Sequence, residues 1–260
     1  MPEVGRARPE APKAGSGQRP GSFRAVGAVY DRSRQSNRRQ PGEPQVAPRM
    51  PAGNEHRDTY HHGNLREALI AAGMRLARVG GPEAVVLREV NRAVGVSHSA
   101  AYRHFPDRDS LLRAVCERSM SELARRMEER MTALPTRRDP KRHAWEALGA
   151  TGQAYIEFAL AEPGWFRTAF GVPHDLGPIS PGEGCGDSGL NPYQLLTGCL
   201  DDLVASGALP AERRRGAEIG PWSAVHGLAT LLVDGPLRGA HPEQLSRQVR
   251  TVLDMVTRGL

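Results

Sequence analysis

Polar side chains that could recognise a nucleic acid are concentrated at 87–105, in the sequence L-R-E-V-N-R-A-V-G-V-S-H-S-A-A-Y-R-H-F. In the second half of this stretch, His98, Ser99, Tyr102 and Arg103 fall on the outward side of an expected helix. Base edges in a DNA groove are recognised by hydrogen-bond donors and acceptors, and these four side chains supply both. The stretch therefore indicates binding of DNA.

Two helices must hold these side chains in place. Leu87, Val90 and Val94 form the apolar face of a first helix, Gly95 allows a tight turn, and Ser97 can cap a second, short helix. The inward side of the second helix is expected to consist of Val96, Ala100 and Phe105. Two helices joined by a short turn that contains glycine form a helix-turn-helix, whose second helix lies in the major groove.

The sequence shows no pattern of a catalytic site. It has no Gly-rich phosphate loop, nucleophile elbow or pair of histidines at metal-ligand spacing. The neighbours His61 and His62 face different directions on a helix, and Asp201 and Asp202 likewise cannot converge on one substrate atom. We expect no catalytic residue, no metal and no cofactor, and we keep a helical enzyme as the alternative from another class.

The cysteines and the apolar runs bear on where the protein works. Cys116, Cys185 and Cys199 lie far apart without a C-x-x-C pair, so we interpret them as reduced thiols. A DNA-binding redox or metal sensor that uses Cys116 or Cys185 is a second alternative. No apolar run approaches the roughly 18 residues that span a bilayer. The N-terminus also lacks the apolar core of a secretory signal, and we therefore expect a cytoplasmic protein.

The first 57 residues differ in composition from the rest. They hold 11 Lys or Arg and 5 Asp or Glu, which accounts for the entire formal charge of +6, and they are rich in Pro and Gly. Such a segment cannot bury enough apolar surface to offset the entropy of ordering it. We predict a disordered tail over 1–57. It is either a basic arm that contacts DNA phosphates or an upstream extension without a role, with Met50 as the translation start.

Helical patterns cover the rest of the chain, which predicts an all-α fold. The first helix starts at a capping box of Asn64 and Glu67 and stops at 80–82, a Gly-Gly-Pro sequence. Its apolar side is expected to be Leu65, Leu69, Ala72, Leu76 and Val79. Further helices, with a loop over 171–189, are predicted at 108–131, 142–160, 192–205, 211–233 and 242–259.

Three segments around the helix-turn-helix carry a family resemblance. They are Y-H-H-G-N-L-R-E-A-L at 60–69, G-V-S-H-S-A-A-Y-R-H-F at 95–105 and P-D-R-D-S-L-L at 106–112. In sequence and spacing they resemble the DNA-binding domain of the TetR (tetracycline-repressor) family of transcriptional regulators. The resemblance implies an N-terminal three-helix domain with the helix-turn-helix, followed by a helical domain for ligand binding and dimerisation.

The resemblance also implies roles for single side chains. Tyr102 and Arg108 match positions that contact phosphates, whereas Ser97, His98 and Ser99 match positions that approach bases. The expected DNA-binding residues are Arg88, Ser97, His98, Ser99, Tyr102, Arg103, His104 and Arg108. One departure is Val86, which stands where the family usually has Thr or Ser. The helix that follows it therefore lacks a side-chain acceptor for its first amides.

A second resemblance lies at 221–228, where P-W-S-A-V-H-G-L matches the W-x-x-x-H-G signature of one TetR C-terminal subgroup. The spacing places Trp222 and His226 on one helix face, where with Ala229 they could form a helix-helix seam. Gly227 would allow close approach of another helix. Packing in the core is one interpretation of the Trp-His pair, and a role in a dimer interface or effector pocket is the other.

The last predicted helix has Leu245, Val249, Val252 and Val256 at helical spacing. With the Trp222 helix it could build a four-helix bundle across a two-fold axis, and the family resemblance favours this homodimer over ordinary intrachain packing. The expected interface residues are Trp222, His226, Ala229, Val249, Val252 and Val256. Two identical reading heads imply a pseudo-palindromic operator.

Aromatic residues are concentrated between Trp145 and Phe170, in a chain with only 5% aromatics. Ligand pockets are mostly apolar with a few polar groups, so this segment is a candidate effector pocket, and a plain core is its alternative. The candidate ligand-binding residues are Trp145, Thr151, Tyr155, Phe158, Trp165 and Phe166.

These observations predict three parts: the tail at 1–57, a helix-turn-helix domain at 58–107 and an effector-binding and dimerisation domain at 108–260. The resulting hypothesis is a homodimeric, ligand-responsive repressor without membrane association. Its partners are a double-stranded DNA operator and an unknown small-molecule effector. Repression, rather than activation, rests on the resemblance.

Overall fold

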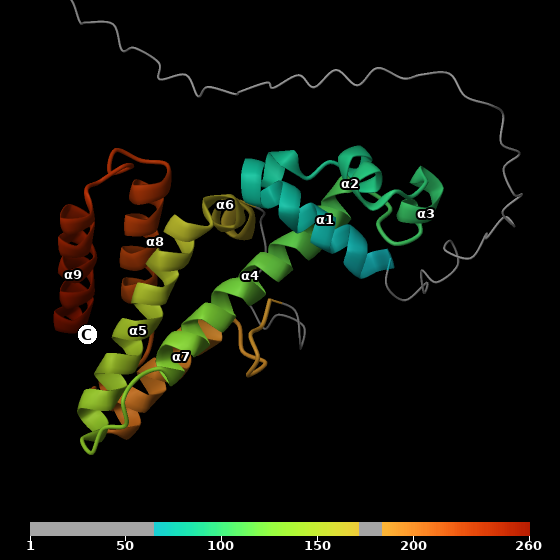
Figure 1. Ribbon diagram of the computed structural model, residues 1–260. Helices are drawn as coiled ribbons and strands as arrows, with labels where there is room; N and C mark the ends of the chain where they lie inside the picture. The colour runs from blue at the N-terminus through green and yellow to red at the C-terminus, as the bar shows by residue number, and fades with distance from the viewer. Residues whose placement is uncertain (1–64, 172–183) are drawn as a thin grey trace, which may run out of the picture. The chain divides into compact units, whose positions relative to one another are not determined.

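The computed structural model describes residues 65–171 and 184–260. The predicted tail, the capping residue Asn64 and most of the predicted loop at 171–189 lie outside the described residues. Both described ranges are helical and contain no strand, so the predicted all-α class is confirmed (Figure 1). In chain order the helices are α1 (Leu65–Gly80), η1 (Pro82–Ala84), α2 (Leu87–Val94), α3 (His98–Tyr102), α4 (Arg108–Thr132), α5 (Pro140–Ala161), α6 (Pro163–Gly171), α7 (Pro192–Ala205), η2 (Ala211–Arg213), α8 (Ile219–Val233) and α9 (Pro242–Gly259).

Helix α1 ends where the sequence predicts. Gly81 has a positive φ of 67° with ψ −162°, a conformation that other residues rarely adopt, and Pro82 begins the short helix η1. The predicted apolar side of α1 is wrong at its C-terminal end, because Val79 is 90% exposed. Ala77, which is fully buried, continues the stripe that Leu69 begins.

Two helix predictions are corrected. Helix α6 is not among the predicted helices and lies between the predicted helix at 142–160 and the predicted loop at 171–189. Proline is tolerated in the first turn of a helix, and here it begins α6 directly after α5. The single helix predicted over 211–233 is instead η2 followed by α8. Gly216, with φ 73°, lies in the break between the two helices.

Helix α4 belongs to two hydrophobic cores. Its first half, with Leu111 and Val115, packs with α1, α2 and α3, around buried residues that include Leu69, Val90 and Phe105. Its second half, with Leu123 and Met127, packs with α5, α6, α8 and α9. A third cluster joins α5 to α7. Figure 1 shows α4 running from the α1–α3 group to the remaining helices, with α8 and α9 side by side.

Helix α6 touches the C-terminal end of α1 backbone to backbone. A Cβ atom added at Gly164 would overlap the carbonyl oxygens of Ala77 and Arg78, so only glycine fits at this crossing. The next residue, Trp165, donates its indole N–H to the carbonyl oxygen of Met74 at 2.8 Å. The two helices therefore pack in direct contact at this point, with no room for a side chain at Gly164.

An ion pair reinforces the same joint. The carboxylate of Glu162, only 5% exposed at the corner between α5 and α6, accepts hydrogen bonds of 2.6 and 2.7 Å from the guanidinium of Arg78 on α1. The guanidinium of Arg126 on α4 lies 3.8 Å away. A buried carboxylate needs such partners because it has lost its hydration. Three parts of the fold thus meet at one side chain.

Within the described ranges, 65–171 and 184–260, no helix combines the length and the apolar character needed to cross a membrane.

Candidate functional site

The turn between α2 and α3 has the geometry that the sequence predicts. Gly95 ends α2 in the left-handed conformation, with φ 76° and ψ 30°. The hydroxyl oxygen of Ser97 then caps α3 by accepting the backbone N–H of Ala100 at 3.3 Å. Val86 gives α2 no side-chain cap, as expected. The helix-turn-helix prediction is confirmed.

The inward side of the second helix differs in one residue from the prediction. Ala101, fully buried, and Phe105, 2% exposed, anchor α3 in the core, whereas Ala100 is only half-buried. The inward side is thus shifted by one residue, and His98 and Tyr102 remain on the exposed side of α3.

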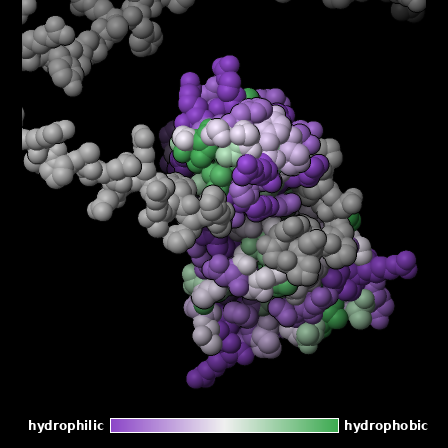
Figure 2. Space-filling model, turned by 90° about the vertical axis from the view of Figure 1, so that its right-hand side faces the viewer, coloured by the Kyte–Doolittle hydropathy of each residue, from purple (hydrophilic) through white to green (hydrophobic). Residues whose placement is uncertain are grey.

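Most of the predicted DNA-binding residues lie together on one exposed surface. Ser97, His98, Ser99, Tyr102 and Arg103 are exposed on and around α3, Arg88 is exposed on α2, and His104 is half-buried. The sequence from Val90 to Pro106 contains arginines and histidines but no acidic residue. Figure 2, which views the molecule from the side of α3, shows a mainly hydrophilic surface. Such a surface can accept phosphates and base edges.

Two pairs of side chains on this surface contact each other. The rings of His98 and Tyr102 lie 4.1 Å apart, centroid to centroid. The hydroxyl oxygens of Ser97 and Ser99 are 3.2 Å apart. The polar groups on the first turn of α3 are therefore held in place before any DNA arrives.

Arg108 has partners within the chain. Its Nε donates to the carbonyl oxygen of Val85 at 2.9 Å, and its Nη2 donates to that of Pro82 at 2.8 Å. The carboxylate of Glu83 lies 3.6 Å from the same Nη2. Arg108 thus fastens the start of α4 to the segment between α1 and α2, a role that the sequence did not predict. Only its remaining N–H groups could reach a phosphate.

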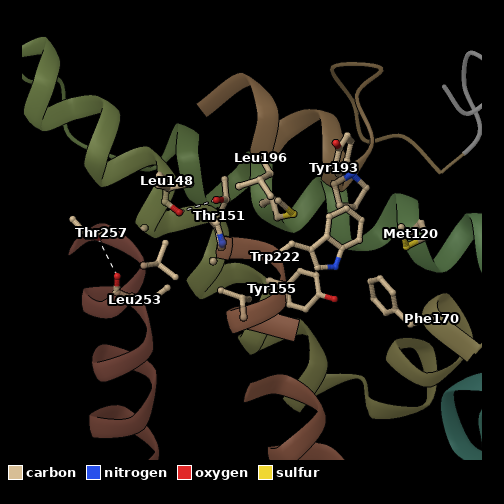
Figure 3. Close-up of a pocket in the computed structure, with 17 residues that line it drawn as sticks. Met120, Leu148, Thr151, Tyr155, Phe170, Tyr193, Leu196, Trp222, Leu253 and Thr257 are labelled. Atoms are coloured by element: carbon tan, nitrogen blue, oxygen red, sulfur yellow. Dashed lines mark hydrogen bonds between the residues drawn. The ribbon is translucent and has the colours of Figure 1, made fainter. Parts of the chain in front are cut away.

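A second candidate site is a cavity among α4 to α9. Its volume is about 620 Å³, including a part that is open to solvent. The residues that line it, several of them shown in Figure 3, are Met120, Met127, Leu148, Gly149, Thr151, Gly152, Tyr155, Phe170, Pro192, Tyr193, Leu196, Pro221, Trp222, Val225, Leu253, Val256 and Thr257.

Two of the six predicted ligand-binding residues line this cavity, Thr151 and Tyr155. The other four have structural positions: Trp145 packs against the α5–α7 cluster, Phe158 and Phe166 are core residues, and Trp165 contacts α1. None of the lining residues on α4, α7 and α9 was predicted from the sequence to bind a ligand. These come from distant parts of the chain, and no local pattern marks them.

Tyr155 is paired with a histidine at the edge of the cavity. Its hydroxyl lies 2.8 Å from Nδ1 of His226, and the rings of Phe166 and Phe170 flank the same imidazole. Burial raises the pKa of the Tyr155 hydroxyl well above its usual value of 10 and lowers the pKa of the His226 imidazole. Both groups are therefore neutral near pH 7.

Within the single chain, the residues predicted for the dimer interface are buried or half-buried. Ala229 and Val256 are buried, Trp222 and Val256 line the cavity, and His226 faces Tyr155. Val249 and Val252 pack against the core formed by α4, α5, α6 and α8. The α9 stripe thus packs partly against its own chain, and the dimer interface stays a prediction.

Cys116, one of the two candidate sensor cysteines, gives little support to a thiol sensor. Burial, with smaller repulsion from a nearby acidic side chain, raises the pKa of Cys116 and of Cys199 to about 12. Cys116 also donates its thiol hydrogen to the carbonyl oxygen of Ala169 at 3.4 Å. A thiol with so high a pKa is a poor nucleophile and metal ligand near neutral pH.

Comparison with known proteins connects both sites to one family. The family model described as bacterial regulatory proteins, tetR family, matches residues 69–115, and that of the tetracyclin repressor-like C-terminal domain matches residues 148–256. No curated protein matches the chain.

Solved structures show the same fold. One similar structure is a protein of unknown function from Rhodococcus sp. RHA1, which is 29% identical with a TM-score of 0.61, over 78% of this chain and 99% of the other. Another is a TetR variant from Acinetobacter baumannii AYE in complex with minocycline. It is 17% identical with a TM-score of 0.51, over 74% of this chain and 93% of the other. At that identity it shows a shared fold alone.

The matched ranges coincide with the two sites. The helix-turn-helix lies within the first range, and the second range contains most of the residues that line the cavity. Together the two ranges span more than half of the chain. The chain belongs to the TetR family, and it is a DNA-binding transcriptional regulator.

Proposed function

We propose that the protein is a ligand-responsive repressor that binds a pseudo-palindromic operator as a homodimer and releases it when a small molecule occupies the cavity. One observation carries the proposal, namely the position of α6. At one end of this helix Phe170 lines the cavity, and at the other end Gly164 and Trp165 contact α1 of the helix-turn-helix domain.

This position gives a ligand a route to the reading head. A molecule that displaces Phe170 moves α6, and α6 cannot move far without displacing α1, because their backbones are in contact at Gly164. Helix α1 packs in turn against α2 and α3. A ligand produces release only if it binds the DNA-incompetent arrangement more tightly than the competent one.

We also propose the division of labour predicted from the sequence, with 58–107 for DNA and 108–260 for the effector and the dimer. The proposed dimer contact uses the exposed apolar residues of α8 and α9, among them Ile219, 61% exposed, and Met255, 54% exposed. Gly227 lies on α8 with no atom of the described chain within 4 Å of an added Cβ, so a second chain could approach there. A two-fold axis at this surface would place two α3 helices on one operator.

The W-x-x-x-H-G motif has a chemical role in this proposal. Trp222 lines the cavity, and His226 is hydrogen-bonded to the cavity residue Tyr155. We therefore propose that the motif marks a TetR subgroup in which the Trp and His build the effector site rather than the dimer contact.

The operator and the response can be tested together. DNA fragments selected from the genome by the purified protein give the operator, and compounds that raise the melting temperature give candidate effectors. Fluorescence anisotropy then measures the Kd for operator and scrambled duplexes with and without each compound. We expect an operator preference of about 10³-fold or more and a loss of operator affinity with an effector. Compounds that bind yet never alter operator affinity contradict the ligand response, and tighter operator binding contradicts release.

A further inference from the structure

The wall of the cavity carries no side chain that is charged near pH 7. None of the 17 residues that line it is Asp, Glu, Lys, Arg or His. A carboxylate, phosphate or ammonium group placed there would lose its hydration without gaining an opposite charge. The wall thus discriminates against charged ligands.

The aromatic residues of the wall favour a flat molecule. Aromatic side chains line the cavity from four helices, with Tyr155 on α5, Phe170 on α6, Tyr193 on α7 and Trp222 on α8. In Figure 3 Tyr155 and Trp222 lie between an end with Leu148 and Leu253 and an end with Met120 and Phe170. A planar ring system can stack against such aromatic side chains in the cavity.

Most hydroxyl groups of the wall already donate their hydrogens to the protein. Thr151 donates to the carbonyl oxygen of Leu148 at 2.8 Å, and Thr257 donates to that of Leu253 at 3.0 Å. The hydroxyl of Tyr193 donates to a carboxylate oxygen of Glu218 at 3.4 Å, outside the wall. These three groups therefore have no hydrogen left to donate to a ligand and can only accept from it.

Tyr155 and Trp222 are the other two polar side chains of the wall, and together they offer a ligand an acceptor and a donor. The Tyr155 hydroxyl can donate to Nδ1 of His226 and still accept a hydrogen bond through its oxygen. The indole N–H of Trp222 has no hydrogen-bond acceptor among the residues that the structure describes. In Figure 3 the indole nitrogen and the phenol oxygen both lie on the side toward Phe170. A ligand hydroxyl, which donates and accepts at once, satisfies both groups, whereas a carbonyl can only accept.

We propose that the effector is a neutral, planar, mainly apolar molecule with a hydroxyl group, of the class of phenols and naphthols, and that its hydroxyl binds between Tyr155 and Trp222. This inference rests on the proposed function of the cavity as the effector site. The His226 imidazole, neutral because burial lowers its pKa, then acts as the acceptor that keeps the Tyr155 oxygen available.

Three probes with one ring system test the class: naphthalene, 2-naphthol and 2-naphthoate. Isothermal titration calorimetry on the full chain at pH 7 gives the Kd of each. We expect 2-naphthol to bind about tenfold more tightly than naphthalene, as one or two net hydrogen bonds imply. We expect 2-naphthoate to bind about a hundredfold more weakly than 2-naphthol. Equal binding of 2-naphthoate, or no binding of any probe, overturns the proposal.

Variants locate the hydroxyl. In Tyr155→Phe, 2-naphthol should bind no more tightly than naphthalene, while naphthalene keeps its affinity. Gly149 lines the cavity, and a Cβ atom added there meets no atom within 4 Å. Gly149→Leu should therefore fill part of the cavity and abolish binding of both 2-naphthol and naphthalene. The matched control is Thr251→Val on the exposed side of α9, which should bind both probes as the wild type does. Unchanged 2-naphthol affinity in a folded Tyr155→Phe overturns the proposal.

The same probes separate this inference from the proposed function. If 2-naphthol binds with the expected pattern and lowers operator affinity, both stand. If it binds with that pattern but leaves operator affinity unchanged, the ligand class stands and the release mechanism fails. If a charged compound releases the operator and competes with none of the probes, the release mechanism stands and the assigned ligand class fails.

Discussion

The imidazole ring of His98 lies against the phenol ring of Tyr102, with centroids 4.1 Å apart and planes inclined by 33°. The sequence resemblance gives the two residues different tasks, a base contact for His98 and a phosphate contact for Tyr102. Because one ring supports the other, a change at Tyr102 acts on both tasks unless the ring is kept.

Substitutions on α3 should therefore separate the two tasks. Tyr102→Phe keeps the ring and removes the hydroxyl, so binding should weaken by similar factors on operator and scrambled DNA. Tyr102→Ala removes the support of His98 and should also lower the ratio of the two affinities. His98→Ala and Ser99→Ala should cost about 1–3 kcal/mol on the operator only. Anisotropy titrations measure the ratio, and an unchanged ratio in both alanine variants contradicts the placement of the reading head.

Arg108 should affect stability as well as DNA binding. Arg108→Ala leaves the carbonyl oxygens of Val85 and Pro82 without their donor, so the free energy of unfolding should fall by about 1–3 kcal/mol. Arg103→Ala is the matched change at an exposed arginine and should leave stability within about 0.5 kcal/mol. Urea unfolding measures both variants. Equal stabilities would show that the Arg108 hydrogen bonds contribute nothing net.

The crossing of α6 over α1 should not tolerate a methyl group. Gly164→Ala places a Cβ against the carbonyl oxygens of Ala77 and Arg78 and should destabilise the fold by about 1–3 kcal/mol. In Gly198→Ala, within α7, the added Cβ meets no atom within 4 Å. That control should gain about 0.5–1 kcal/mol, because alanine favours the helix. Thermal unfolding distinguishes them, and a neutral Gly164→Ala would mean that the two helices can separate freely.

Charges on the packed face of α9 should act on the fold, whereas charges on exposed residues of α8 and α9 should act on the dimer. Val249→Glu with Val252→Glu puts carboxylates against the core of the same chain and should lower the melting temperature strongly. Ile219→Glu with Met255→Glu alters exposed positions and should halve the mass in solution while the fold persists. Light scattering with thermal unfolding tests both. An undiminished mass for the second pair would exclude these residues from the dimer contact.

The buried thiols should be inert in the native protein. With pKa values of about 12, the fraction of Cys116 or of Cys199 that is thiolate at pH 8 is on the order of one in 10⁴. A thiol reagent should therefore modify both only after unfolding. Because the folded pKa exceeds the unfolded value, these groups stabilise the fold below pH about 8.5, and that contribution falls as the pH rises toward about 12. Rapid native modification of Cys116 would revive the thiol-sensor alternative.

The sequence predicted the fold well where local signals decide it. The bounds of α7 and α9 match the predicted ranges, and the turn at Gly95 with its cap at Ser97 follows from backbone preferences that neighbouring residues set. Pro163 was misjudged because the same residue can end one helix and start another, and tertiary contacts at Gly164 decide between the two.

The candidate cavity could not be predicted in the same way. Met120 on α4 and Thr257 on α9 both line it, although they are far apart in the sequence. Only the packing of six helices brings them together. The apolar stripe of α9 was visible in the sequence, but a stripe at helical spacing does not say which surface covers it. The structure supplies the partner for Val249 and Val252 from the same chain.

The double membership of α4 bears on how the molecule unfolds. Leu111 and Leu123 lie on one continuous helix but in different cores. If one core unfolds, its apolar side chains on α4 become exposed to water while the other core keeps the rest of α4 folded. The predicted boundary after residue 107 would sever Leu111 and Val115 from the core that encloses α2 and α3. A fragment cut at that boundary should fail to fold, whereas one that keeps the first half of α4 retains its core, so the reading head and the sensor share a single cooperative unit.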